Sequence, residues 1–145
     1  MNLSDELKNL IEDCELSNNK IIVRNRLHDV VALLKQKYFY DMLKNITAVD
    51  LGDEIEILYY LYSTTEQEDA ILSVTVKYEA ESITDIFESA IADENEIYDM
   101  FGITFIGHDD LKRLYMPENW KGHPLRKDYV EDDMRLAWND STDKI

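Results

Sequence analysis

The uneven distribution of glycine and proline limits where regular structure can form in this chain. Three of the four glycines and both prolines fall between residues 96 and 129 of the 145-residue sequence. Proline lacks the backbone N–H that helices and sheets use, and glycine favours turns. We therefore expect a globular part in residues 1–101 and an extended, ordered arm with a tail in residues 102–145. At this length the two parts should form one structural unit.

The first hundred residues carry helical and strand periodicities in turn. Apolar residues recur at helical spacing in three segments, and Ser82 is placed to cap the last of them. Strand patterns occur in four segments, of which the last three are joined by short polar links. This order predicts an α+β fold, a two-layer sandwich in which helices cover one face of a mixed or antiparallel sheet. The helical segments are 3–14, 27–34 and 82–91, and the strand segments are 20–23, 42–51, 54–62 and 70–78.

The charge of the chain is large and unevenly placed. A formal net charge of −16 makes nucleic acid or an anionic membrane surface an unfavourable direct partner. Between residues 111 and 129, however, five basic residues stand against two acidic ones, so this stretch is +3 and the remainder is −19. A basic arm on an acidic body can dock onto a complementary partner or fold back onto its own domain. Composition leaves both possibilities open.

The single cysteine excludes some kinds of site and suggests a compartment. Cys14 alone cannot form an internal disulfide, an all-cysteine zinc site or an iron–sulfur site. It falls on the apolar stripe of the first predicted helix, so we expect a buried structural thiol. The acidic N-terminus lacks an apolar signal core, and no apolar run approaches the roughly 20 residues that span a bilayer. We expect a cytoplasmic chain that reaches a membrane only through partner subunits.

Residues capable of catalysis are present, but their spacing does not indicate an active site. His108 and His123 each follow a glycine and lie fifteen residues apart, without a spacing typical of metal ligands. Glu96 and Asp99 are three residues apart, which is more typical of capping, pairing with arginine or a partner contact than of acid–base catalysis. Two alternatives stay open: a stand-alone metal-dependent hydrolase using His108 and His123, and a free acidic adaptor protein. We predict no catalytic, cofactor or metal site in the chain itself.

The arm has the composition of a protein interface. Aromatic and methionine side chains supply anchors of the kind enriched at interface centres. Arg113 and Arg126 can each form bidentate pairs with carboxylates, which fix register as well as adding energy. Some of the aromatic residues could instead complete the core of the domain.

These residues together resemble the signature of a known family. Residues 96–103 read Glu-Ile-Tyr-Asp-Met-Phe-Gly-Ile and residues 122–129 read Gly-His-Pro-Leu-Arg-Lys-Asp-Tyr. Between them stand Phe105, Gly107, His108, Leu111, Arg113, Leu114 and Trp120. This dense pattern closely resembles the 30-kDa subunit family of respiratory complex I, also known as the C subunit of NADH:quinone oxidoreductase. The family includes a related subunit of energy-converting nickel–iron hydrogenases.

The resemblance implies a non-catalytic, peripheral subunit of a membrane-associated oxidoreductase whose electron transfer is coupled to ion translocation. Such a subunit holds no cofactor and packs against a large subunit that forms the quinone site or carries the nickel–iron site. A small iron–sulfur subunit belongs to the same complex, so the clusters reside in the partners, at the cytoplasmic face of the membrane. Whether the complex reduces quinone or acts as a hydrogenase stays open. The predicted partner-binding residues are Glu96, Tyr98, Asp99, Met100, Phe101, Gly102, Phe105, Gly107, His108, Arg113, Trp120, Gly122, His123, Pro124, Leu125, Arg126, Lys127, Asp128 and Tyr129.

Overall fold

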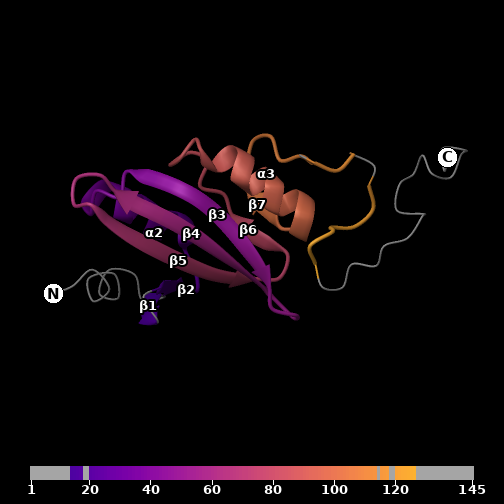
Figure 1. Cartoon of the computed structure of the whole chain (residues 1–145), viewed down its shortest axis with the longest axis horizontal. Helices are drawn as coiled ribbons and strands as arrows, with labels where there is room; N and C mark the ends of the chain where they lie inside the picture. Colours follow the sequence, from indigo (N-terminus) through magenta and orange to yellow (C-terminus); the bar gives the residue numbers. More distant parts are fainter. Residues whose placement is uncertain (1–13, 18–19, 114, 118–119, 127–145) are drawn as a thin grey trace, which may run out of the picture.

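The computed structural model describes residues 14–17, 20–113, 115–117 and 120–126 (Figure 1). Within these ranges the chain forms an α+β fold, as the periodicities predict. Among the described residues, no helix combines the length and the apolar character that crossing a membrane requires. The elements in chain order are β1 (Cys14–Ser17), β2 (Lys20–Val23), α2 (Leu27–Lys37), β3 (Met42–Asp50), β4 (Ile55–Ser63), β5 (Glu68–Val76), β6 (Glu79–Glu81), α3 (Ala90–Phe101) and β7 (Thr104–Ile106).

Five strands form a mixed sheet in the order β1-β2-β5-β4-β3. The pairs β1–β2, β5–β4 and β4–β3 are antiparallel, and β2 runs parallel to β5. Tyr59 of β4 lies opposite Ile46 of β3 and Leu72 of β5. Because side chains alternate along a strand, this register aligns the apolar residues of neighbouring strands on one face. The mixed sheet is confirmed.

Strand β4 is fully buried along one face only. Every second residue of β4 is buried, and the residues between them are partly exposed. The buried side chains belong to one continuous core that also contains the apolar residues of α2 and α3. Both helices therefore pack on the same side of the sheet, which confirms the two-layer sandwich. The core residues of these three elements are Ile55, Ile57, Tyr59 and Leu61 in β4, Leu27, Val30, Val31 and Leu34 in α2, and Ala90, Ile97 and Phe101 in α3.

The helix predicted from Ser82 starts later, at Ala90. The Ser82 hydroxyl donates to Glu94 Oε1 at 2.7 Å, and the Ile83 N–H donates to Glu94 Oε2 at 2.9 Å. The Ser82 hydroxyl also accepts the Thr84 N–H at 3.2 Å, and the Phe87 N–H donates to the Ile83 carbonyl at 2.9 Å. A single turn therefore forms here, but it does not continue as a helix. The turn in between keeps Ile83 and Phe87 buried, and this imitates a helical stripe in the sequence. The predicted start at Ser82 was wrong for this reason.

Two other local predictions differ from the structure. Cys14 begins β1 and pairs with Val23, so it does not belong to a helix; the rest of that predicted helix lies outside the described residues. A small two-stranded sheet, in which β6 pairs in parallel with β7, was not predicted. Strand β7 lies beyond residue 101, so the first residues of the predicted arm pair with the globular part. Residues 127–145 lie outside the described residues.

Candidate functional site

The C-terminal end of α3 is the place where the arm meets the globular part. The helix ends at Gly102, whose φ of 76° is left-handed and whose N–H donates to the Tyr98 carbonyl at 2.9 Å. A Cβ added at Gly102 would lie 2.6 Å from Cδ2 of His123. The arm thus approaches the helix end so closely that residue 102 has room for no side chain.

A buried ion pair joins α3 to the arm. Asp99 is fully buried and the Arg113 side chain is 7% exposed, with Arg113 Nη1 at 2.8 Å from Asp99 Oδ1. The second carboxylate oxygen, Asp99 Oδ2, accepts the backbone N–H groups of Tyr115 at 2.6 Å and Met116 at 3.0 Å. Removing one partner of such a pair typically costs about 3–5 kcal/mol, because the other charge stays buried. Asp99 therefore has the role of pairing with an arginine.

The same arginine also fixes the next turn of the arm. Arg113 Nη2 donates to the carbonyl oxygens of Trp120 and Gly122, both at 2.7 Å. His123 Nδ1 lies 2.9 Å from the Asp99 carbonyl oxygen, which can only accept, so Nδ1 carries the proton. We refer to Asp99, Arg113 and His123 as the anchoring cluster.

The environment of His123 favours its neutral form. Burial is the main cause that lowers the pKa of His123, and the nearby charges of Arg113 and Arg126 lower it further. The hydrogen bond to the Asp99 carbonyl acts in the opposite direction. A neutral ring is also consistent with the close packing of His123 against Gly102. Protonation would place a further positive charge between two arginines.

The last described turn of the arm bonds to the final carbonyls of α3. The Leu125 N–H donates to the Met100 carbonyl at 2.8 Å, and Arg126 Nη1 donates to the Phe101 carbonyl at 2.7 Å. The Arg126 guanidinium also lies 5.6 Å from the centre of the Tyr78 ring. A cation at a helix C-terminus is favourable because the helix dipole is negative there. Composition left two possibilities open, and the described residues between 113 and 126 take the one in which the arm folds back onto its own domain.

This fold-back leaves three large side chains exposed near the end of α3. Tyr115 is 65% exposed and Leu125 is 55% exposed, although their backbone N–H groups bond to Asp99 and Met100. Tyr78, beneath Arg126, is 66% exposed. We refer to Tyr78, Tyr115 and Leu125 as the arm face. Tyr78 was missed in the sequence because it ends an alternating strand pattern and looks like a core residue.

The predicted partner-binding residues fall into three classes of burial where the structure describes them. Lys127, Asp128 and Tyr129 lie outside the described residues. Within the described part, Asp99, Phe101 and Phe105 are buried; Glu96, Gly107 and Leu125 are exposed; and Tyr98, Met100, Gly102, His108, Arg113, Trp120, Gly122, His123, Pro124 and Arg126 are partly buried.

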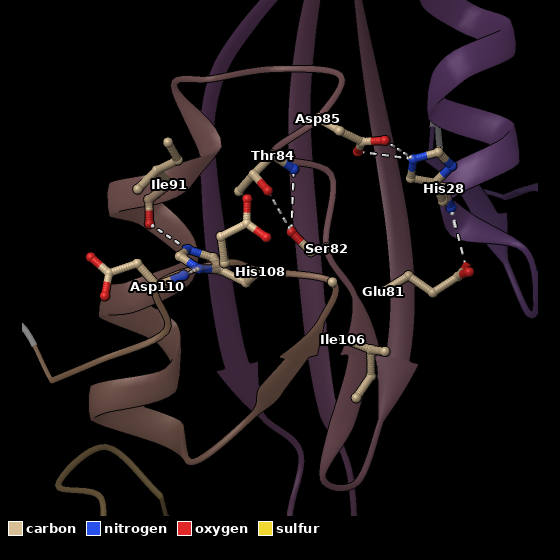
Figure 2. A pocket seen from close by; sticks show the side chains of 11 residues that line it. His28, Glu81, Ser82, Thr84, Asp85, Ile91, Ile106, His108 and Asp110 are labelled. Carbon is tan, nitrogen blue, oxygen red and sulfur yellow. Dashed lines mark hydrogen bonds and ion pairs between the residues drawn. The ribbon is translucent and has the colours of Figure 1, made fainter.

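A groove with a cavity volume of about 420 Å³ lies at the opposite end of α3 (Figure 2). His108 lines it, with Nε2 at 3.3 Å from the Ile91 carbonyl oxygen and Nδ1 at 3.1 Å from the backbone nitrogen of Asp110. The carbonyl must accept and the N–H must donate, so Nε2 carries the proton and both ring nitrogens are engaged. His28 lies across the groove, with Nε2 within 2.9 Å of both Asp85 carboxylate oxygens.

The two histidines that a hydrolase would need are not brought together. His108 bonds to the carbonyl of Ile91 and His123 to that of Asp99, which is eight residues further along α3, or about 12 Å. Within the described ranges, no group of three or more His, Cys, Asp or Glu side chains is placed to hold a metal ion. The stand-alone hydrolase alternative therefore has no shared metal site at these two residues.

The comparisons with known proteins are consistent with one another. Residues 21–134 match the family model described as respiratory-chain NADH dehydrogenase, 30 Kd subunit. The NADH-quinone oxidoreductase C subunit of Roseiflexus sp. is 38% identical over 83% of this chain and 74% of its own length. The C subunit of Moorella thermoacetica is 32% identical over 88% of this chain and 93% of its own. The C/D subunit of Phocaeicola vulgatus is 38% identical over 76% of this chain, which spans only 22% of that longer protein.

A solved structure has a similar fold. A chain in the structure of the membrane-bound sulfane sulfur reductase, an archaeal respiratory membrane complex, matches with a TM-score of 0.71. The match covers 97% of this chain and 89% of the other, at 24% sequence identity. At this identity the likeness supports the fold alone.

Proposed function

Because the chain belongs to the family of the 30 Kd subunit of respiratory-chain NADH dehydrogenase, we propose that it is a non-catalytic, peripheral subunit of a complex-I-like oxidoreductase. In this proposal it docks through the arm onto the large subunit of that complex. Its contribution is binding surface and positioning, and the electron-transfer chemistry belongs to the partner subunits.

The fixed arm face is the observation that carries this proposal. The anchoring cluster holds the arm through an ion pair and several backbone hydrogen bonds, so Tyr115 and Leu125 are presented on an ordered backbone. Ordering these side chains before contact lowers the entropy cost of association. Tyrosine and arginine are enriched at interface centres. The buried cluster shapes the arm, and the exposed residues make the contact.

The assembly that we propose has three further features. The large partner is a 49-kDa-like or nickel–iron-hydrogenase-like subunit, and a small iron–sulfur subunit accompanies it. The iron–sulfur clusters, and nickel–iron in a hydrogenase, are held by those partners. The complex couples electron transfer to ion translocation, and this subunit lies at the cytoplasmic face of the membrane, held there by its partners.

Affinity purification of a tagged chain from solubilised membranes tests the proposal. Leu125→Glu places a charge on the arm face, and Leu51→Glu is a matched control because both leucines are 55% exposed. Burying a whole leucine contributes about 1.5–3 kcal/mol, and docking can bury the exposed 55% of Leu125, so Leu125→Glu should lower the recovery of the large subunit about fourfold or more. Leu51→Glu should leave the recovery unchanged. Equal recovery with both variants, or a wild-type chain that recovers no redox subunit, contradicts the proposal.

A further inference from the structure

The groove at the N-terminal end of α3 combines apolar and acidic surface. Ile91 and Ile106 line it and are 40% and 54% exposed. Around them stand four carboxylates, and among the described residues that line the groove there is no lysine or arginine. The carboxylates are Glu81, Asp85, Asp109 and Asp110. Figure 2 labels Glu81, Asp85 and Asp110.

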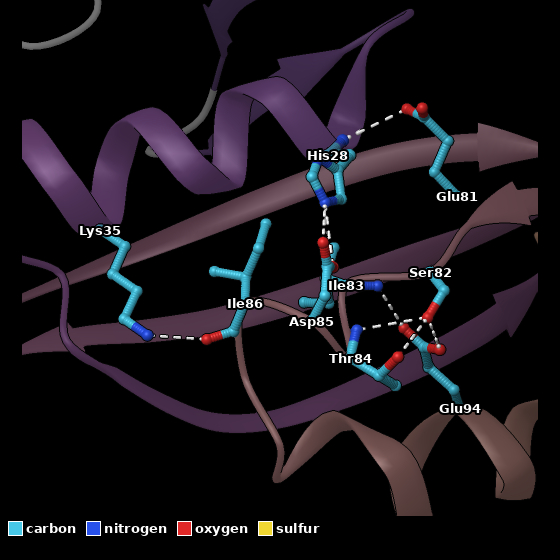
Figure 3. Close-up of polar contacts among 9 residues, drawn as sticks. All are labelled: His28, Lys35, Glu81, Ser82, Ile83, Thr84, Asp85, Ile86 and Glu94. Carbon is cyan, nitrogen blue, oxygen red and sulfur yellow. Dashed lines mark hydrogen bonds and ion pairs between the residues drawn. The ribbon is translucent and has the colours of Figure 1, made fainter. Parts of the chain in front are cut away.

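The walls of this groove are held in place by contacts between distant segments. His28 of α2 pairs with Asp85 through its ring, and its backbone N–H donates to Glu81 Oε1 at 3.2 Å (Figure 3). On the same side, Lys35 Nζ donates to the Ile86 carbonyl at 2.7 Å. These contacts tie the 81–86 segment to α2. The groove is therefore present before any partner arrives, which lowers the cost of binding.

The buried Glu94 supports the same segment from beneath. It is fully buried and binds the Ser82 hydroxyl and the Ile83 N–H (Figure 3). Burial raises the pKa of Glu94, and these two hydrogen bonds oppose that effect. On the other side, the Ser82 N–H donates to the Ile106 carbonyl at 2.8 Å. Strand β7 and the 82–84 turn thus form one connected wall.

We propose that this groove is a second docking site, which accepts a lysine-bearing segment of a neighbouring subunit. The argument is complementarity: four carboxylates attract an ammonium group, and the two isoleucines can pack along the aliphatic stem of a lysine. Asp85 and Asp110 already pair with His28 and Lys112 of this chain. An apolar segment without a cation would bring no positive charge to the other two carboxylates, and an acidic segment would be repelled. The inference rests on the proposed function, because it requires the chain to be part of an assembly.

The groove and the arm face are separate surfaces, and the chain segments that form them differ in net charge. The groove lies where His108 contacts Ile91, whereas the arm contacts residues 99–101 at the other end of the helix. The 111–129 stretch has a net charge of +3, while the lining of the groove is acidic. Charge complementarity favours correct partners and excludes wrong ones. The two ends of α3 therefore select segments of different chemistry.

Carbodiimide cross-linking of the purified complex tests this second site. The reagent joins a carboxylate to a lysine in direct contact, and mass spectrometry identifies the joined residues. Asp110 and Lys112 of this chain lie 3.2 Å apart and report that the reaction has worked. We expect Glu81, Asp85 or Asp109 to be joined to a lysine of another subunit. An intact complex in which these three carboxylates give no intersubunit product overturns the inference and leaves the proposed function standing.

Charge-matched variants then test whether the contact contributes to binding. Asp109→Asn with Asp110→Asn removes two groove carboxylates, and Asp53→Asn with Glu54→Gln removes two exposed carboxylates from the β3–β4 hairpin. Each exposed ion pair contributes a factor of about two to five in affinity. The double groove variant should therefore lower the amount of the cross-linked subunit that survives a salt wash by about fivefold or more. Equal retention with both double variants overturns the inference. If the wild-type chain recovers no redox subunit at all, the proposed function is overturned as well.

Discussion

Replacing Gly102 with alanine tests how closely the arm is packed against α3. Two costs are expected. The residue adopts a φ of 76°, where a side chain costs about 1–2 kcal/mol. The added Cβ would also lie 2.6 Å from the His123 ring, so the ring must move and its 2.9 Å hydrogen bond to the Asp99 carbonyl is lost. A hydrogen bond contributes about 0.5–1.5 kcal/mol, so the total loss in free energy of unfolding is about 2–3 kcal/mol.

A double-mutant cycle separates these two costs. In a His123→Ala background the obstacle is gone, so Gly102→Ala should cost only the backbone term of about 1–2 kcal/mol. Gly52 is the control, because it also has a positive φ, of 107°, but an added Cβ there meets no atom within 4 Å. The cost of Gly52→Ala should be the same in both backgrounds. Urea unfolding followed by circular dichroism measures all variants. The reasoning is refuted if Gly102→Ala costs the same with and without His123.

Three other predictions concern buried polar groups. Asp99→Ala should lower the free energy of unfolding by about 3–5 kcal/mol, because Arg113 is left as a buried, unpaired charge. A loss below about 1 kcal/mol in urea titrations would show that the ion pair does not stabilise the fold. The pKa of His123 is lowered in the folded state, so the unfolded state binds more protons just below pH 6.5. The contribution of His123 to the free energy of unfolding should therefore be fully present above pH 6.5 and decrease as the pH falls through that value. An NMR titration of the ring that gives a pKa at or above 6.5 would contradict this. Tyr59→Phe should leave the free energy of unfolding unchanged or raise it by about 1 kcal/mol in thermal unfolding, because the buried hydroxyl has no hydrogen-bond partner within the described residues. A decrease of more than about 1 kcal/mol would show that the hydroxyl has a partner.

The elements that the sequence predicts well are those whose periodicity reflects burial directly. In β4, Ile55, Ile57 and Tyr59 alternate with partly exposed residues, and the structure buries that same face. The start of α3 could not be read this way, because Ile83 and Phe87 are buried in a turn with nearly helical spacing. The Phe87 N–H even bonds to the Ile83 carbonyl as in a helix, although α3 itself begins only at Ala90.

The candidate site was visible as a concentration of unusual residues, but its arrangement was not. Asp99 and Arg113 are fourteen residues apart, and no local pattern identifies them as a buried pair. The strands β6 and β7 are three residues each, too short for alternation to be recognised. The fold-back of the arm depends on these long-range contacts, so composition alone could not choose between a free arm and a folded one. The charge pattern likewise allowed a complementary partner for the arm without identifying one.

Site-specific photo-cross-linking from position 125 in intact cells is the most direct test of the docking proposal. A photoreactive amino acid in place of Leu125 samples whatever covers the arm face, and the same residue at Leu51 is the control because both leucines are equally exposed. The proposal predicts that position 125, and not position 51, becomes joined to the large redox subunit of a membrane-associated oxidoreductase. Products from position 125 that contain only this chain, or unrelated proteins, would contradict it.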